Sequence, residues 1–166
     1  MKEVMYNEYA KEALEALSKG AFLSVSHEGK DNLMTIAWGN IGFMWKKPIF
    51  TVMVRYSRYT YDLIEKSDCF TVSIPLKADM KEALKICGSL SGRDHDKWEK
   101  TNLTKVSAKN TKAPLVGECD LHYECRIIGK TALTSDMLEQ SVKDKCYTKG
   151  DYHVLYYGEI VATYVK

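Results

Sequence analysis

Residues Ile49–Thr60 read I-F-T-V-M-V-R-Y-S-R-Y-T, a run of β-forming residues that leads directly into a basic, hydroxyl-rich turn. The first seven residues are mostly apolar or β-branched, which predicts a strand. A short helix is expected over Thr60–Lys66. The guanidinium groups and hydroxyls of the turn, with the free N–H groups at the start of that helix, would converge on one small volume, as a phosphate monoester requires. On spacing alone, a solvated basic turn that only caps the helix is an alternative of equal weight.

Other short β-type runs surround this stretch. A-F-L-S-V-S begins at Ala21, L-M-T-I-A-W at Leu33 and C-F-T-V-S-I at Cys69. Strands in such quick succession, separated by turn-rich segments, predict an antiparallel sheet. Apolar residues at helical spacing predict one helix over about residues 8–19 and another over Met80–Leu90. Helices inserted among strands, without regular alternation, indicate a mainly β fold with peripheral helices.

The last third of the chain supplies two further strands. Lys97–Lys112 is polar and is expected to be mostly loop, with at most one short strand. In C-D-L-H-Y-E-C-R-I, which begins at Cys119, apolar and polar residues alternate, which predicts a half-buried strand. The β-rich run His153–Val165 is expected to end the chain inside a strand, where a barrel could close or a partner subunit could pair.

Length and composition limit the function classes. The 166 residues, 45% of them hydrophobic and 28% charged, predict a single packed domain over residues 1–166. The net charge of +2 is too small for general binding to nucleic acid. No apolar run approaches the roughly 20 residues that cross a bilayer, and the acidic N-terminus does not resemble an export signal, so a cytoplasmic protein is expected. The five cysteines form no C-x-x-C pair and are interpreted as reduced thiols, with no metal site.

Several common catalytic motifs are absent from the sequence. No G-x-G-x-x-G, P-loop, G-x-S-x-G or H-E-x-x-H pattern occurs, and the four histidines lack ligand spacing. The sequence therefore gives no support to a Rossmann nucleotide site, a hydrolase triad or a metalloenzyme. We predict no protein residue as a nucleophile or general base.

Two more segments carry polar groups in places where they could meet a ligand. N-L-M-T-I-A-W, Asn32–Trp38, places a Thr and a Trp on a strand that is otherwise apolar. C-G-S-L-S-G-R-D-H-D-K-W, Cys87–Trp98, follows a helix with a Ser-Gly turn and two cations, and glycine permits close approach of the backbone to a ligand. Taken singly, an ordinary edge strand and an exposed helix cap explain these segments better.

Taken in order, the three segments resemble the flavin reductase-like family, which has the FMN-binding split β-barrel fold and includes flavoredoxin and NAD(P)H:flavin oxidoreductases. The resemblance covers about residues 20–165. It is carried by Asn32, Met34, Thr35 and Trp38, by Arg55, Ser57, Arg58 and Thr60, by Cys87, Gly88, Ser91, Gly92, Arg93, Asp94 and Lys97, and by H-V-L-Y-Y-G-E-I from His153.

The resemblance implies an FMN cofactor and assigns roles to residues. The strand Met34–Trp38 would lie along the flavin ring, with Thr35 at its polar edge, and Arg55–Thr60 would hold the phosphate and ribityl chain, with Ser57 and Thr60 donating hydroxyls. The Ser91-Gly92 turn, Lys97 and His153 would lie near the cofactor. The full set of expected cofactor-binding residues is Asn32, Met34, Thr35, Ile36, Ala37, Trp38, Val54, Arg55, Ser57, Arg58, Thr60, Cys87, Ser91, Gly92, Lys97 and His153.

The resemblance also implies a reaction, in which hydride passes from NAD(P)H to flavin and electrons pass on to an acceptor. A homodimer with flavin near the interface is expected. The alternative is a flavoredoxin-like electron-transfer protein without a nicotinamide site of its own. A third possibility is a small β-barrel that binds single-stranded nucleic acid through its eleven tyrosines, against which the near-neutral charge argues. Cys87 lies in the apolar stripe of its helix, which favours a small buried hydrophobic residue over a reactive thiol.

Overall fold

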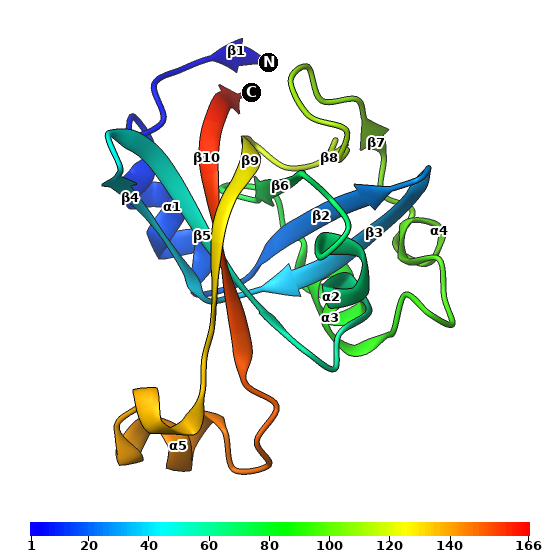
Figure 1. The fold of residues 1–166 in the computed structure, drawn as a ribbon. Coiled ribbons are helices and arrows are strands. Elements are labelled where there is room, and N and C mark those ends of the chain that lie inside the picture. The colour runs from blue at the N-terminus through cyan, green and yellow to red at the C-terminus, as the bar shows by residue number, and fades with distance from the viewer.

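An antiparallel sheet organises the chain in the computed structural model, which describes residues 1–166 (Figure 1). Its strands follow the order β3-β2-β6-β9-β10-β5-β4, with β1 added along β10, and β7 and β8 form a separate two-stranded sheet. The strands are β1 (Lys2–Glu3), β2 (Ala21–His27), β3 (Lys30–Ile36), β4 (Gly39–Met44), β5 (Lys47–Arg55), β6 (Cys69–Ile74), β7 (Lys105–Val106), β8 (Leu115–Val116), β9 (Leu121–Ala132) and β10 (His153–Val165).

Short helices lie around this sheet, so the predicted mainly β fold with peripheral helices is confirmed. They are α1 (Ala10–Leu17), α2 (Tyr59–Ile64), α3 (Lys81–Ser89), α4 (Lys97–Thr101), α5 (Gln140–Cys146) and a 3-10 turn (Ser135–Met137). The helices expected over residues 8–19, 60–66 and 80–90 are present with shorter bounds. None of the helices combines the length and the apolar character needed to cross a membrane.

The two longest strands, β9 and β10, run past the rest of the sheet, and the segment that joins them projects from the barrel (Figure 1). We call this segment, residues 133–152, the arm; it contains the 3-10 turn and α5. The pairing of β9 with β10 shifts register at two places, between Tyr157 and Gly158 and between Ile160 and Ala162. Such bulges increase the bend of a strand, which lets the pair curve across the barrel.

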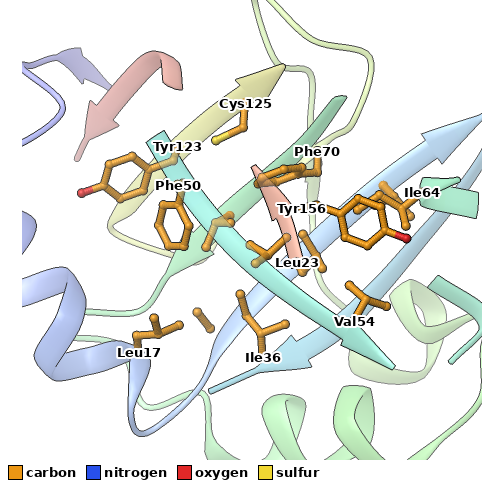
Figure 2. Close-up of a cluster of buried hydrophobic side chains, with 14 of the residues drawn as sticks. Leu17, Leu23, Ile36, Phe50, Val54, Ile64, Phe70, Tyr123, Cys125 and Tyr156 are labelled. Carbon is orange, nitrogen blue, oxygen red and sulfur yellow. The ribbon is translucent and has the colours of Figure 1, made fainter. Parts of the chain in front are cut away.

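Side chains from both halves of the sheet fill the main core (Figure 2). Leu23, Phe50, Phe70 and Tyr123 are all fully buried there. Gly158 on β10 permits this packing, because a Cβ at that position would lie 2.5 Å from the ring of Phe70. The core therefore joins strands that lie far apart in the sequence.

Residues 97–112 are mostly loop, as expected, but they also contain the short helix α4, which was not predicted. The Asp96 carboxylate caps α4 by accepting bonds from the N–H groups of Trp98 and Glu99. The single short strand expected there is β7. The expectation that β9 is half-buried was wrong for its first five residues, since the polar residues His122 and Glu124 are as fully buried there as their apolar neighbours.

Hydrogen bonds within the chain explain why those polar residues can be buried. His122 bonds to Ser73 Oγ and to the carbonyl of Cys119, at 3.0 and 3.2 Å. The Glu124 carboxylate accepts bonds from the N–H groups of Lys109 and Asn110. The strand β4 and helix α5 were not predicted at all.

Candidate functional site

Two adjoining pockets lie where β3, the start of α2 and the segment between α3 and α4 meet. The first, of about 160 Å³, is lined by Asn32, Met34, Thr35, Ser57, Arg58, Tyr59, Thr60, Cys87, Gly88, Ser89, Leu90, Ser91, Gly92, Arg93 and Lys97. The second, of about 200 Å³, is lined by Met34, Thr35, Ile36, Ala37, Trp38, Met53, Arg55, Arg58 and His153. Because they share Met34, Thr35 and Arg58, the two pockets form one groove.

Every residue that the sequence predicts to bind the cofactor lines this groove, except Val54. The side chain of Val54 is fully buried in the main core instead. The reason is the alternation along β5, which turns Val54 inward and leaves Met53 and Arg55 at the second pocket.

Thr60 is held ready to donate a hydrogen bond into the first pocket. The side chain of Thr60 is buried, and its Oγ1 accepts a 2.7 Å bond from the Asn32 amide. No acceptor within the chain takes the hydroxyl proton of Thr60. Gly92 completes this corner, because a Cβ there would lie 2.0 Å from Asn32 Oδ1 and 2.8 Å from the ring of Tyr59.

Lys97 is a buried cation in the same pocket without an acidic partner. The residue is 5% exposed, and its ammonium donates to the carbonyl of Cys87 at 3.1 Å. Burial lowers the pKa of Lys97 to about 8, and the positive charge of Arg58 adds to this effect. Burying a charge without a counter-ion is unfavourable, so this position favours an anionic ligand.

Cys87 contributes its carbonyl to this corner but not a reactive thiol. The residue is buried among Phe22, Leu33 and Trp98, and burial raises the pKa of its thiol to about 11. A neutral thiol in apolar surroundings behaves as a small hydrophobic group.

The residues of the motif Arg55–Thr60 contact two different parts of the structure. Arg58 and Thr60 line the first pocket. The Nη atoms of Arg55 instead donate to two arm carbonyls, those of Asp151 at 2.7 Å and Cys146 at 2.9 Å. Ser57 lines the pocket, but its N–H and its hydroxyl both donate to the Asp151 carboxylate, at 3.1 and 2.6 Å. Arg55 and Ser57 therefore bind the arm in this structure.

Aromatic groups line the second pocket. Trp38 is 43% exposed, and its ring centroid lies 5.3 Å from that of His153. His153 is buried and shares a 2.7 Å hydrogen bond with the Tyr147 hydroxyl. Burial, together with the charges of Arg55 and Arg58, lowers the pKa of His153 to about 4, so the ring is neutral near pH 7. This end of the groove is apolar and open on one side.

Thr35 stands between the two pockets. Its hydroxyl donates to the Leu84 carbonyl at 2.5 Å, so the oxygen can only accept a bond from a ligand. Thr35 can therefore accept a bond from an N–H group of a ligand at this point of the groove.

Arg93 and Asp151 both shape the site but were not in the expected set of cofactor-binding residues. Arg93 donates to the Ser57 carbonyl at 3.1 Å and to Asp62 at 2.8 Å, and it thereby ties the Ser-Gly turn to α2. Arg93 is one of the two cations that the sequence places beside this turn, although no role in cofactor binding was assigned to it. Asp151 lies far from the motif in sequence and gave no signal.

These features fit a flavin mononucleotide. Arg58, Thr60 and Lys97 offer donors for a phosphate, Gly92 leaves room beside them, and the apolar second pocket could take an aromatic ring. Small-molecule sites typically enclose about 300–1,000 Å³, a range that the two pockets reach together.

Comparison with known proteins identifies the fold and the family. The flavin reductase like domain matches residues 15–166. An uncharacterized protein from Archaeoglobus fulgidus is 33% identical over 84% of this chain and 68% of its own length. Flavoredoxin from Desulfovibrio vulgaris (Miyazaki F) is 25% identical with a TM-score of 0.69, over 89% of this chain and 69% of that protein.

A third comparison supports the same fold. An FMN-binding domain of a flavin reductases-like enzyme from Shewanella baltica OS155 has a TM-score of 0.71 and 20% identity, over 99% of this chain and 76% of that protein. The split-barrel fold predicted from the sequence is thus confirmed, and FMN, the cofactor that the resemblance implied, is the cofactor of the family. This chain belongs to the flavin reductase-like family.

Proposed function

We propose that this chain binds FMN in the groove and acts as an oxidoreductase that accepts hydride from NAD(P)H and passes electrons to a further acceptor. The observation that carries the proposal is the buried ammonium of Lys97, which lacks a counter-ion in a pocket that also presents Arg58 and Thr60. When bound, FMN would supply the hydride- and electron-transfer chemistry.

The protein would contribute binding and orientation. Arg58 and Lys97 would neutralise the phosphate, and the Thr60 hydroxyl, oriented by Asn32, would donate to it. At the other pocket, Met34 and Trp38 would contact the ring, while the open side would leave one face of the ring accessible to a donor. No side chain of the groove needs to act as a nucleophile.

The first experiment is a visible spectrum of the purified chain, recorded before and after addition of FMN and desalting. Retention of the yellow flavin spectrum is expected. A colourless chain that also fails to retain added FMN would contradict the proposal.

Flavoredoxin-like electron transfer is the competing function, and the similarity to a flavoredoxin at 25% identity favours it. The two functions differ in the source of electrons. Rapid anaerobic bleaching by NADH or NADPH would support the oxidoreductase, whereas bleaching only by dithionite or a reduced protein partner would support the carrier. We expect no mobility shift with short oligonucleotides, since the net charge is only +2.

We further propose that the chain forms a homodimer through the hairpin of β4 and β5. Phe43 and Trp45 on this hairpin are 63% and 62% exposed, and β4 is the last strand on its side of the sheet. Exposed aromatic side chains on an edge strand are typical of an interface. A cytoplasmic location is proposed as well, supported by five cysteines that are all free.

A further inference from the structure

We propose that Asp151 is a specificity-determining residue for the flavin phosphate, because its carboxylate occupies the two donors of Ser57 that a phosphate oxygen would otherwise use. The inference rests on the proposed binding of FMN in the first pocket. It adds that phosphate binding displaces Asp151 and so loosens the arm, whereas an unphosphorylated flavin leaves the contact intact.

The geometry of the Ser57–Asp151 contact is the first support. One carboxylate oxygen of Asp151 accepts from the Ser57 N–H at 3.1 Å, and the other accepts from the Ser57 hydroxyl at 2.6 Å. A serine hydroxyl has one proton, so Ser57 cannot donate it to a ligand while Asp151 holds it. Carboxylate and phosphate oxygens are alternative acceptors for the same pair of donors.

The position of Ser57 is the second support. Ser57 lines the first pocket, next to Arg58, whereas Asp151 lines neither pocket. The Asp151 carboxylate is bonded to Ser57 at the edge of the pocket. A phosphate bound in the pocket would therefore lie close to this carboxylate. Two anions at one pair of donors repel each other, so one of them must leave.

A ligand could also displace the Asp151 carboxylate from Ser57. Both hydrogen bonds are exposed to solvent, which weakens them. Asp151 adopts a left-handed backbone conformation with φ of 56°, directly after Gly150 with φ of 71°. Aspartate adopts this conformation more readily than most residues, so the backbone can keep it with or without the Ser57 bonds.

The arm would remain attached after the exchange. Arg55 still donates to the carbonyls of Asp151 and Cys146, and its guanidinium lies 5.0 Å from the centroid of the Tyr147 ring. These contacts are partly buried, in contrast to the Ser57 bonds. Displacement of the Asp151 carboxylate would therefore increase motion of residues 147–151 without freeing the whole arm.

The test compares dissociation constants of FMN and riboflavin for the full chain and for Asp151→Asn, by quenching of flavin fluorescence. Asparagine tolerates the left-handed conformation, so the fold is expected to persist. The variant should bind FMN roughly two- to fivefold more tightly, the range for one exposed charge, and riboflavin unchanged. Asp136→Asn is the matched control, because Asp136 is an exposed arm carboxylate that bonds only to Thr134.

Amide hydrogen exchange gives a second readout. FMN, but not riboflavin, should increase exchange of residues 147–151 in the wild-type chain, and neither flavin should do so in Asp151→Asn. An unchanged or lower preference for FMN in Asp151→Asn would overturn the inference, since it would make Asp151 merely a support for Ser57. If Asp151→Asn gives that result while the wild-type chain still binds FMN, only this inference is overturned. If the wild-type chain binds neither flavin, the proposed function is overturned as well.

Discussion

The Lys97 ammonium lies 3.1 Å from the Cys87 carbonyl oxygen and has no carboxylate partner, although the lysine is 95% buried by the same surroundings that lower its pKa to about 8. A bound phosphate would stabilise the charged form and raise that pKa again. We therefore expect proton uptake when FMN binds at pH 8–9. Calorimetric titrations in buffers of different ionisation enthalpy measure it.

The matched variants for this prediction are Lys97→Met and Lys100→Met. Lys100 is an exposed lysine on the same helix, so its loss should leave proton uptake and affinity unchanged. Lys97→Met should abolish the uptake and weaken FMN binding. Equal proton uptake in both variants would contradict the assignment of Lys97 to the phosphate.

Thr60→Ala should weaken FMN binding by roughly 10- to 100-fold, since a hydrogen bond to a charged group contributes about 1.5–3 kcal/mol. Thr60→Ser retains the hydroxyl that Asn32 orients, and it should restore most of the affinity. Retention of FMN after desalting reports both effects. Wild-type retention by Thr60→Ala would remove this residue from the site.

Gly92→Ala should distort the first pocket, because its Cβ would lie 2.0 Å from Asn32 Oδ1 and 2.8 Å from the ring of Tyr59. Overpacking of this kind costs about 1–3 kcal/mol of folding free energy. Gly42→Ala is the control, since no atom lies within 4 Å of its added Cβ. Urea denaturation with and without FMN should show a loss for Gly92→Ala only, and equal stability of the two variants would refute the close packing.

Stability should fall as the pH drops from about 6.5 to 4. Burial lowers the pKa of both His122 and His153 to about 4 in the folded chain, below the value of about 6.5 for an unfolded histidine. Between these values the unfolded state binds more protons, so the free energy of unfolding rises with pH. Urea denaturation across this range measures the slope, and NMR titration should show both rings largely neutral above pH 5.

The proposed homodimer through the β4–β5 hairpin can be tested by mutation. Phe43→Ser combined with Trp45→Ser should shift the chain from dimer to monomer in light scattering, because both side chains are largely exposed in a single copy. Met5→Ser, which changes another exposed apolar residue, should leave the mass unchanged. A wild-type chain that is already monomeric would contradict the proposed interface.

Local sequence patterns predicted most elements of this fold. The strands β2, β3, β5, β6 and β10 followed from runs of β-forming residues, and the helices α1 and α3 from apolar residues at helical spacing; α2 was also expected. The strand β4 was missed because its two glycines and Asn40 resemble a loop, and α4 because its start depends on the Asp96 cap. Burial on both faces of β9 could not be predicted, because the partners of Glu124 come from another part of the chain.

For the site, the sequence determined which residues are available: the Arg55–Thr60 motif, the Ser-Gly turn, Lys97 and His153. The tertiary structure decided which group each of these residues contacts. Arg58 and Thr60 face a pocket, while Arg55 and Ser57, in the same six residues, bind an arm that lies about 90 positions later in the chain. The physical reason is that a donor bonds to whichever acceptor the fold brings within about 3 Å, and spacing along one strand carries no information on acceptors contributed by another.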